Sequence, residues 1–371
     1  MILARPSVVI YKHVVRPVMF KFHPDRAHHG VTTLLHVSGR VPGVPAVTRL
    51  VLNRRHKELE IDWKGMHFSS PVGLSAGLDK NGRLVPMVKA LGFGFTEVGS
   101  VTAEPCAGNE KPWFYRLPKT GSLVVHVGLA NVGVKRVLER MHALPLRLQK
   151  DFPKILSVAR TNSQEASGVE EGVADFVASV KAAKKSPAIQ AVEINISCPN
   201  AFCGQAFTDP ELFEKLMVAI DAVKFKKPIF IKLPIDQPWK ETKKILDAAV
   251  AHGVTGVTVA NLTKDRSKLD LKDELPDHVQ GSFSGAPVRA QSTDLVRKIY
   301  KSYGKDLVII GVGGVMSAQD AYDKIKAGAT FVELITGLIM RGPFIEEVNS
   351  GLVKLLKADG YSHISQAVGK G

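Results

Sequence analysis

The feature that most constrains the fold of this chain is a regular alternation that begins near residue 67. Apolar, strand-like runs end in Gly, Ser, Thr or Asn, and a helical pattern follows each of them. Parallel strands that are buried on both faces are apolar along their whole length. Eight such units in succession predict an α/β fold, the (β/α)8 or TIM barrel. The eight runs are 67–77, 95–103, 155–162, 191–200, 228–236, 254–263, 307–315 and 330–338.

The segments that follow these runs have helical periodicity, which supports the same fold. They are 83–91, 132–147, 168–184, 209–223, 239–252, 293–300, 318–327 and 344–357. A doubly wound sheet is the alternative for such an alternation, but no GxGxxG pattern follows the first run. A barrel places its active site at the carboxyl ends of the strands.

Length and composition are compatible with one large barrel and a short extension. The chain has 371 residues, of which 45% are hydrophobic and 23% are charged, as is typical of a globular protein. Pro and Gly in the stretch 40–45 predict a linker, so we expect a helical segment at 1–40 and a barrel domain at 41–371. The segment 104–130 shows no clear helix, and the segment 264–292 is polar and rich in glycine. Both are expected to form functional loops or lids.

Residues 1–40 have the pattern of two short amphipathic helices, separated at His23-Pro24-Asp25. The first 60 residues hold ten Lys or Arg and three acidic residues. A basic amphipathic pair suits a membrane interface, and a helical cap on the barrel is the alternative. No run reaches the ~18 apolar residues of a membrane-spanning helix, and we expect no cleavable signal peptide.

The cysteine count and the net charge narrow the classes of protein. The three cysteines, Cys106, Cys198 and Cys203, are odd in number and form no CxxC pair. We therefore expect no disulfide framework, no metal site and a reducing compartment. A protein with a formal charge of +15 can bind nucleic acid, an anionic membrane or anionic ligands. Because the charges are scattered and no nucleic-acid-binding motif is present, we expect no nucleic-acid partner.

Polar side chains are concentrated at the end of the fourth predicted strand, in Asn195-Ile196-Ser197-Cys198-Pro199-Asn200. Pro199 cannot donate to a strand ladder, so the strand is expected to end there. The amides can hydrogen-bond a planar polar ligand, and the thiol can accept a proton as the thiolate. A strand-to-loop turn punctuated by Asn and Pro is the simpler alternative.

Two glycine-containing loops follow the last two predicted strands, Gly311-Val312-Gly313-Gly314 and Ile335-Thr336-Gly337. Glycine lets backbone N–H groups approach phosphate oxygens, and these barrels commonly bind phosphate after strands seven and eight. Ser284-Gly285 can supply further donors. Tight turns alone would explain any one of these loops, but their joint position predicts a ligand that carries a phosphate.

Two lysines are candidates for the same site. Lys232 lies in the apolar run Ile229-Phe230-Ile231-Lys232-Leu233, and a buried lysine is costly unless something pairs with it. Inside the barrel, the positive charge of Lys232 could pair with an anion or an electron-poor ring. The alternative is a shift of one residue in the strand, which would point the side chain outward. Lys80 follows the first predicted strand, at the same end of the barrel.

Several stretches together carry a family resemblance. They are Ala76-Gly77-Leu78-Asp79-Lys80-Asn81-Gly82, Gly92-Phe93-Gly94, Glu97-Val98-Gly99-Ser100-Val101-Thr102, Asn195 to Asn200, Ile310-Gly311-Val312-Gly313-Gly314 and Gly342-Pro343. This combination resembles dihydroorotate dehydrogenase from about residue 17 to the C-terminus. The segment Phe22-His23-Pro24-Asp25-Arg26-Ala27-His28 is similar to the N-terminal signature of the quinone-dependent, membrane-associated class.

The resemblance implies an FMN-containing barrel that oxidises dihydroorotate to orotate in pyrimidine synthesis. It implies that Cys198 is the base that removes the C5 proton while hydride passes from C6 to flavin N5. The implied electron acceptor is a quinone, which enters between the N-terminal helices near Arg116 at a membrane surface. The protein is then expected to be peripheral, on the cytoplasmic side of a membrane.

The resemblance also implies ligand contacts by position. The residues implied to contact FMN are Ala76, Gly77, Lys80, Ser100, Asn195, Lys232, Ala260, Gly285, Gly313, Gly314, Ile335, Thr336 and Gly337. Those implied to hold the substrate are Lys80, Asn195, Asn200 and Asn261.

The chain departs from the family pattern at several positions. The quinone class usually has serine as its base, whereas the soluble classes have cysteine. This chain has a cysteine, Cys198, at that position. Val125 replaces an asparagine that reads the pyrimidine, Val158 replaces one that contacts the flavin, and Leu262 replaces a threonine on strand six. Each lost hydrogen bond is worth roughly 1 kcal/mol. Two alternatives follow: an FMN enzyme for another dihydropyrimidine or an enone, and an inactive barrel that binds a membrane surface.

Overall fold

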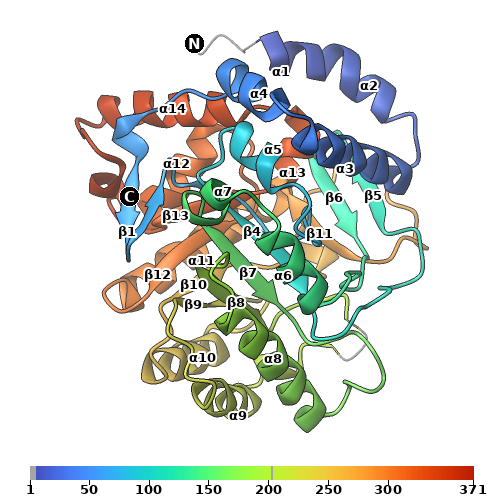
Figure 1. Ribbon diagram of the computed structural model, residues 1–371, viewed down its shortest axis with the longest axis vertical. Coiled ribbons are helices and arrows are strands. Elements are labelled where there is room, and N and C mark those ends of the chain that lie inside the picture. Colours follow the sequence, from blue (N-terminus) through green and yellow to red (C-terminus); the bar gives the residue numbers. More distant parts are fainter. Residues whose placement is uncertain (1–5, 202–203) are drawn as a thin grey trace.

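The computed structural model describes residues 6–201 and 204–371, and its centre is a closed barrel of eight parallel strands (Figure 1). The order around the barrel is β3-β4-β7-β8-β9-β10-β12-β13, and β13 pairs with β3. Each strand overlaps one predicted run, so the prediction of a (β/α)8 barrel is confirmed. The bounds are β3 Val72–Leu74, β4 Phe95–Val101, β7 Lys154–Val158, β8 Ala191–Asn195, β9 Ile229–Leu233, β10 Gly256–Val259, β12 Val308–Val312 and β13 Phe331–Leu334.

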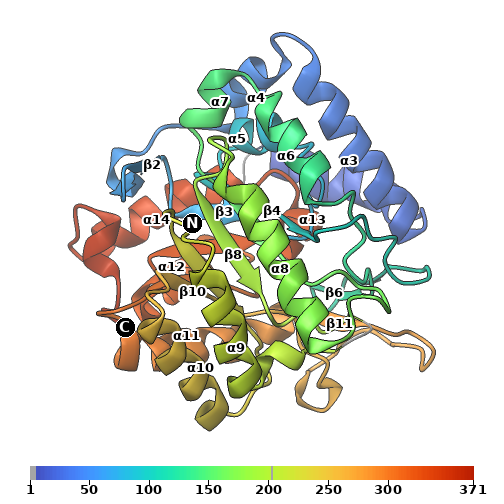
Figure 2. The same ribbon diagram turned by 60° about the horizontal axis from the view of Figure 1, so that its bottom comes forward.

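Helices surround the strands and bury their apolar faces on them (Figure 2). Several begin at residues that the sequence marks as helix starts. Asp209 caps α9 by accepting from the backbone N–H groups of Glu211 and Leu212, and Ser317 caps α12. The bounds are α5 Val85–Ala90, α6 Val134–His142, α7 Leu146–Lys150, α8 Val169–Lys184, α9 Pro210–Asp221, α10 Trp239–Ala251, α11 Arg289–Tyr303, α12 Ala318–Ala327, α13 Thr336–Arg341 and α14 Ile345–Ala358.

A short hairpin of β1 (Ile61–Trp63) and β2 (Met66–Phe68) closes the amino-terminal end of the barrel. Phe68 lies 4.5 Å from Phe331 and 5.6 Å from Phe95, measured between ring centroids. Because aromatic side chains fill this end, the opposite end remains for a site.

The chain before the barrel is helical. The first predicted helix is α1 (Pro6–Ile10), a π-helical turn (Tyr11–Val15) and α2 (Arg16–Met19), and the second is α3 (Pro24–Arg40). A further helix, α4 (Val44–Leu52), begins within the predicted linker, because proline is favoured in the first turn of a helix as well as in linkers. Figure 1 shows these blue helices together along one side of the molecule. The division at residue 40 stays a prediction.

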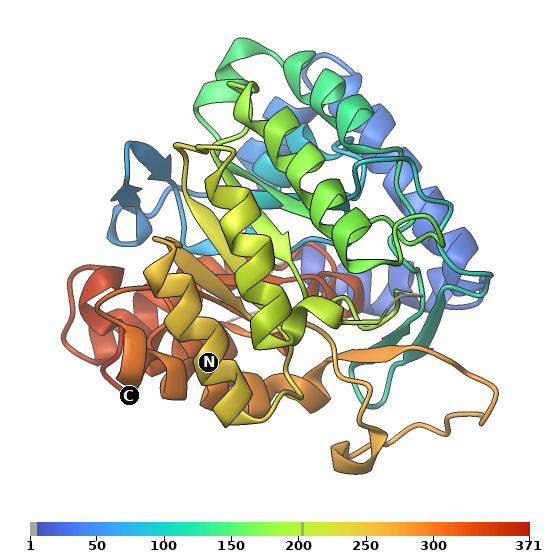
Figure 3. The same ribbon diagram turned by 90° about the horizontal axis from the view of Figure 1, so that it is seen from below.

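The expectation that 104–130 and 264–292 are only loops is wrong. The first segment contains β5 (Phe114–Leu117) and β6 (Ser122–Val125), and the second contains β11 (Ser282–Gly285). These strands form a small antiparallel sheet, in which β6 lies between β5 and β11. Each strand has four residues, and β11 pairs with a partner about 160 positions away, so no local pattern reveals the pairing. Figure 3 shows the arm that leads to β11 extending from the body.

Candidate active site

A cavity lies at the carboxyl ends of the barrel strands, with the β5-β6-β11 sheet as one wall. His28 of α3 also lines it, so the N-terminal extension contributes to the site. Every residue predicted to contact cofactor or substrate lines this cavity. They are Ala76, Gly77, Lys80, Ser100, Asn195, Cys198, Asn200, Lys232, Ala260, Asn261, Gly285, Gly313, Gly314, Ile335, Thr336 and Gly337.

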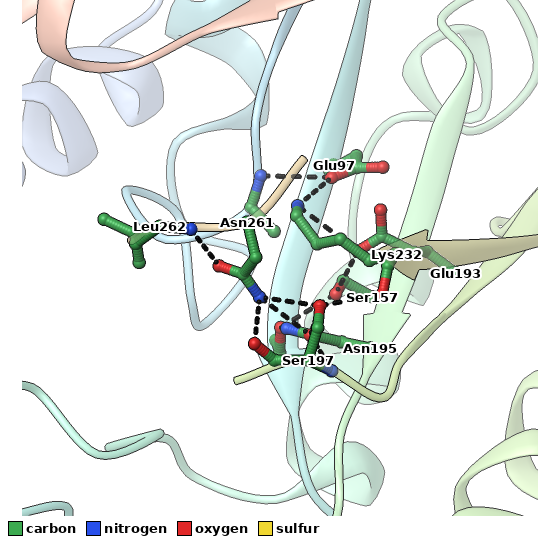
Figure 4. Close-up of polar contacts among 10 residues, drawn as sticks. Glu97, Ser157, Glu193, Asn195, Ser197, Lys232, Asn261 and Leu262 are labelled. Atoms are coloured by element: carbon green, nitrogen blue, oxygen red, sulfur yellow. Dashed lines mark hydrogen bonds and ion pairs between the residues drawn. The ribbon is translucent and has the colours of Figure 1, made fainter. Parts of the chain in front are cut away.

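Asn195, the last residue of β8, is held by hydrogen bonds at both ends of its amide (Figure 4). Its Nδ2 donates to Ser100 Oγ at 2.8 Å, and its Oδ1 accepts from Asn261 Nδ2 at 3.1 Å. Ser100 in turn bonds Ser157, whose hydroxyl donates to Glu193 at 2.7 Å. The amides at the mouth are thereby fixed before any ligand arrives.

Asn200 ties the predicted polar tip to the sheet above it. Its Nδ2 donates to the carbonyl oxygen of Val125 at 2.8 Å, and its Oδ1 accepts from Ser282 Oγ at 3.0 Å. Because Val125 is on β6 and Ser282 is on β11, one side chain connects the end of β8 with both strands. The sheet and the barrel mouth are therefore held in one arrangement.

Cys198 is half-buried and lines the cavity between the two asparagines. Its side chain packs against Cys106, Leu129 and Ala159. Burial in this apolar corner raises the pKa of the Cys198 thiol. The neutral thiol is therefore the main form near pH 7, and a basic thiolate forms more readily as the pH rises.

Lys232 of β9 points into the barrel, where it lies between two carboxyl groups (Figure 4). Its Nζ is 3.3 Å from Glu97 Oε2 and 3.4 Å from Glu193 Oε1. The outward orientation considered from the sequence is thus excluded. Lys232 also lines the cavity, so its positive charge faces the place where a ligand would lie.

Three fully buried glutamates accompany Lys232, and the sequence analysis did not identify them as a group. Glu97, Glu193 and Glu333 come from β4, β8 and β13. The available signal was a single acidic residue inside each of three apolar strands. Burial and the nearby Glu193 raise the pKa of Glu97 to about 8, and burial raises that of Glu333. Burial opposes the charge of Lys232, but the three carboxyl groups outweigh it and raise its pKa.

Lys80 supplies a second cation on the other side of the cavity. Its Nζ donates to the carbonyl oxygen of Gly77 and lies 5.7 Å from the centre of the Phe114 ring. Burial lowers the pKa of Lys80 to about 8, and Asp79 partly opposes this. Burial and the charge of Lys80 lower the pKa of His28 to about 3, so His28 is neutral at physiological pH.

The glycine-containing loops pack so closely that a side chain would not fit. Gly285 has a φ of +87°, and a Cβ there would lie 2.8 Å from Thr336 Cγ2. Gly314 has a φ of +75°, and its Cβ would lie 3.0 Å from the carbonyl oxygen of Gly285. A Cβ on Gly337 would lie 2.4 Å from the carbonyl oxygen of Val315. The three loops therefore pack against one another and form one cradle of backbone that lines the cavity, an arrangement that is suited to a phosphate group.

Part of the cavity wall is apolar at positions where the family pattern has polar residues. Val125 and Leu262 line the cavity together with Val127 and Leu129. Val158 does not line it and is fully buried in β7. The replaced positions therefore lie on two parts of the wall, the end of β6 at Val125 and the chain after β10 at Leu262.

Arg116 of β5 does not line the cavity. Its guanidinium donates to the carbonyl oxygens of Met19 and Phe22 and lies 4.5 Å from the centre of the Phe20 ring. It thus fixes the end of α2 to the small sheet. Its predicted place near a quinone stays a prediction.

The chain is similar in sequence and fold to known proteins over nearly its whole length. The sequence profile of the family described as dihydroorotate dehydrogenase matches residues 58–356. "Dihydroorotate dehydrogenase (quinone)" of Anaeromyxobacter dehalogenans is 34% identical over 360 residues, covering 96% of this chain and 95% of that protein. The protein of the same name from Deinococcus deserti is 34% identical over 370 residues, covering 97% and 99%.

Solved structures agree with the sequence matches. Ligand-free DHODH from Eimeria tenella has a TM-score of 0.79 at 28% identity and covers 92% of this chain and 98% of that chain. The same enzyme in complex with ferulenol has a TM-score of 0.81 at 27% identity and covers 95% and 98%. The chain belongs to the dihydroorotate dehydrogenase family of oxidoreductases.

Proposed function

We propose that this protein oxidises dihydroorotate to orotate, with FMN as its cofactor, Cys198 as the base and a quinone as the electron acceptor. The family is generally flavin-dependent, and the matched relatives are named as quinone-dependent enzymes. One observation carries the proposal. A single cavity joins the glycine cradle, the buried Lys232 and the polar tip around Cys198.

The residues around the cavity fit FMN. The cradle of Gly285, Gly314 and Gly337 offers backbone donors to a phosphate group. Lys232 offers a permanent positive charge, and Asn195 offers a fixed amide, to a polar ring system. FMN, when bound, would supply the acceptor for the hydride, which carries the two electrons that leave the substrate.

The chain's own residues would position the substrate and take its proton. Lys80 offers a cation to the substrate carboxylate, and the amides of Asn195, Asn200 and Asn261 offer hydrogen bonds to the pyrimidine. Cys198, between the asparagines, accepts the proton from carbon at Sγ.

The apolar wall favours a second candidate function. Val125, Val127 and Leu262 offer no hydrogen bond to a pyrimidine edge. The same flavin chemistry on a less polar dihydropyrimidine or an enone would leave no polar group of the ligand unpaired against this wall.

We also place the protein at a membrane surface, on its cytoplasmic side, as a peripheral protein. Within residues 6–201 and 204–371, no helix is long and apolar enough to cross a bilayer. Among the described residues, fifteen large hydrophobic residues are exposed, and twelve of them lie in the helices before the barrel, α1 to α4, and in the turns between these helices. Such a surface suits shallow insertion at an interface and access for a quinone. The twelve are Val9, Ile10, Val14, Val15, Val18, Phe22, Leu34, Val37, Val41, Val47, Leu50 and Val51.

The first experiment mixes FMN-loaded protein with dihydroorotate in the absence of oxygen and follows the visible absorbance of the flavin. Rapid bleaching is the expected result, and quinone should then restore the colour. If the flavin binds and dithionite bleaches it but dihydroorotate does not, the second candidate replaces the first. A protein that cannot bind FMN would overturn both and favour a non-catalytic barrel.

A further inference from the structure

A fully buried lysine lies behind the glycine cradle, outside the cavity. Lys324 of α12 has no solvent exposure, and its Nζ donates to Ser292 Oγ at 2.9 Å and to Thr293 Oγ1 at 3.0 Å. Both hydroxyl groups belong to residues near the N-terminus of α11. Lys324 makes no ion pair within 4.0 Å among the described residues, although buried ammonium groups are usually paired with an anion.

This lysine contacts the strand and the helix that shape the cradle. A Cβ on Gly311 of β12 would lie 3.3 Å from Lys324 Cδ, and a Cβ on Gly313 would lie 3.2 Å from Ser292 Oγ. Ser292 Oγ also donates to the carbonyl oxygen of Val312. A short chain of contacts therefore leads from the ammonium group through Ser292 to the loop that follows β12.

The charges around Lys324 leave it short of a counter-charge. Burial lowers the pKa of Lys324 to about 7, and the positive charge of Arg289 contributes to this lowering. Three carboxylates oppose this lowering, those of Asp320, Asp294 and Asp323. Asp320, the acid that opposes this lowering most, is already bonded to Arg289 and to the backbone of Met316. In the absence of a ligand, the ammonium group therefore loses its proton easily.

We propose that Lys324 is a positioning residue for the phosphate of the cofactor, to which it supplies a buried positive charge from behind the cradle. This inference rests on the proposed function, because it requires that FMN bind in the cavity. A phosphate dianion in the cradle would be the counter-charge that Lys324 lacks. The ammonium group acts through Ser292 and the β12 loop and does not touch the reacting atoms.

The binding of FMN should then depend on pH. A phosphate in the cradle raises the pKa of Lys324, so the complex binds one more proton than the free protein at pH values above about 7. FMN affinity should then fall as the pH rises from 7 to 8.5, by up to about tenfold per pH unit. Riboflavin lacks the phosphate, and its affinity should not follow this trend.

The experiment measures the binding of FMN and of riboflavin to the cofactor-free, full-length chain, by quenching of flavin fluorescence at pH 6.5 to 8.5. Lys324→Met should reduce the ratio of FMN affinity to riboflavin affinity by about tenfold or more, as loss of one buried charge predicts. The variant should also lose the fall in that ratio above pH 7.

Lys154→Met is the matched control. Lys154 is also fully buried, and burial lowers its pKa to about 7. Its ammonium group donates to the carbonyl oxygens of Leu148, Gln149 and Phe152, at the opposite end of the barrel. This variant loses a buried lysine of the same kind and should keep the ratio and its dependence on pH.

Each outcome has one meaning. An unchanged ratio in a folded Lys324→Met protein would overturn the inference and leave the proposed function intact. If that variant does not fold, the unaltered chain decides, because a ratio that does not fall above pH 7 also overturns the inference. Failure of the unaltered chain to bind FMN would overturn the proposed function and this inference together.

Discussion

Cys198 combines the position of a base with the chemistry of a buried thiol. It lies in the cavity between Asn195 and Asn200, and burial raises its pKa. A base of this kind works at neutral pH only if proton removal and thiolate formation are coupled to the loss of hydride. Cys198 is therefore placed where the proposed base is needed, and we expect its efficiency to depend on pH.

Replacing Cys198 with Ala should leave FMN bound, because the cradle is elsewhere, and should slow flavin reduction by dihydroorotate about 10²- to 10⁴-fold. In the unaltered protein, this rate should increase from pH 7 to 9 as more thiolate forms. Stopped-flow absorbance measures both. A Cys198→Ala protein that reduces its flavin at the unaltered rate would remove Cys198 as the base.

Glu97 gives a prediction about stability. Its pKa is about 8 in the folded protein and 4.5 in the reference state, so the folded protein binds the extra proton between these values. This stabilisation is complete below pH 4.5 and is lost as the pH rises through 8. Urea unfolding of the cofactor-free chain should show the loss, at up to about 1.4 kcal/mol per pH unit for one proton.

Glu97→Gln should flatten this dependence on pH, because the amide does not titrate. Glu139→Gln is the control, since Glu139 is exposed on α6 and its pKa is lowered by Arg136. If Glu97→Gln and the unaltered chain lose stability in parallel between pH 5 and 8, the carboxyl group of Glu97 does not hold the proton.

At the scale of elements, the helical extension has two different faces. One face reaches the site: His28 lines the cavity, and Asp25 accepts hydrogen bonds from the backbone N–H groups of Trp113 and Phe114. The other face exposes valines and leucines to solvent. An element that lines the cavity and also exposes apolar surface is suited to bring a lipid-soluble electron acceptor close to the cavity.

A substitution on this face tests that role. Val18→Asp should weaken binding to anionic lipid vesicles and slow reduction of a long-chain quinone, because it places a charge on the inserting surface. Val218→Asp on α9 is the control, since Val18 is 54% exposed and Val218 is 57% exposed. Co-sedimentation with vesicles measures binding, and equal losses in both variants would contradict a membrane role for the extension.

At the scale of the whole molecule, the cavity is assembled from parts that lie far apart in the sequence. Its wall includes α3, the ends of the barrel strands and a small sheet from two insertions. A ligand in this cavity contacts segments from residue 28 to residue 339, so its binding opposes unfolding of the entire chain.

FMN should therefore raise the melting temperature, by an amount that grows with the logarithm of the free FMN concentration above its Kd. At a free concentration 100 times its Kd, the expected stabilisation is about 2.7 kcal/mol. Differential scanning fluorimetry of the cofactor-free chain with FMN measures the shift. Adenosine monophosphate is the control for a ligand that carries a phosphate but no flavin ring. No shift with FMN at saturating concentrations would contradict the cavity as its site.

The barrel and the position of its polar tip follow from patterns along the chain, because periodicity and the placement of Gly and Asn are local properties. The sequence also predicted that the two glycine-containing loops, Cys198 and Lys232 lie at one end of the barrel, where they line one cavity. Only the tertiary structure decided that β6 pairs with β11, that three glutamates meet around Lys232, and that Lys324 lies behind the cradle. Each of these depends on contacts between distant segments, whose energy comes from burial and pairing that a linear pattern does not contain.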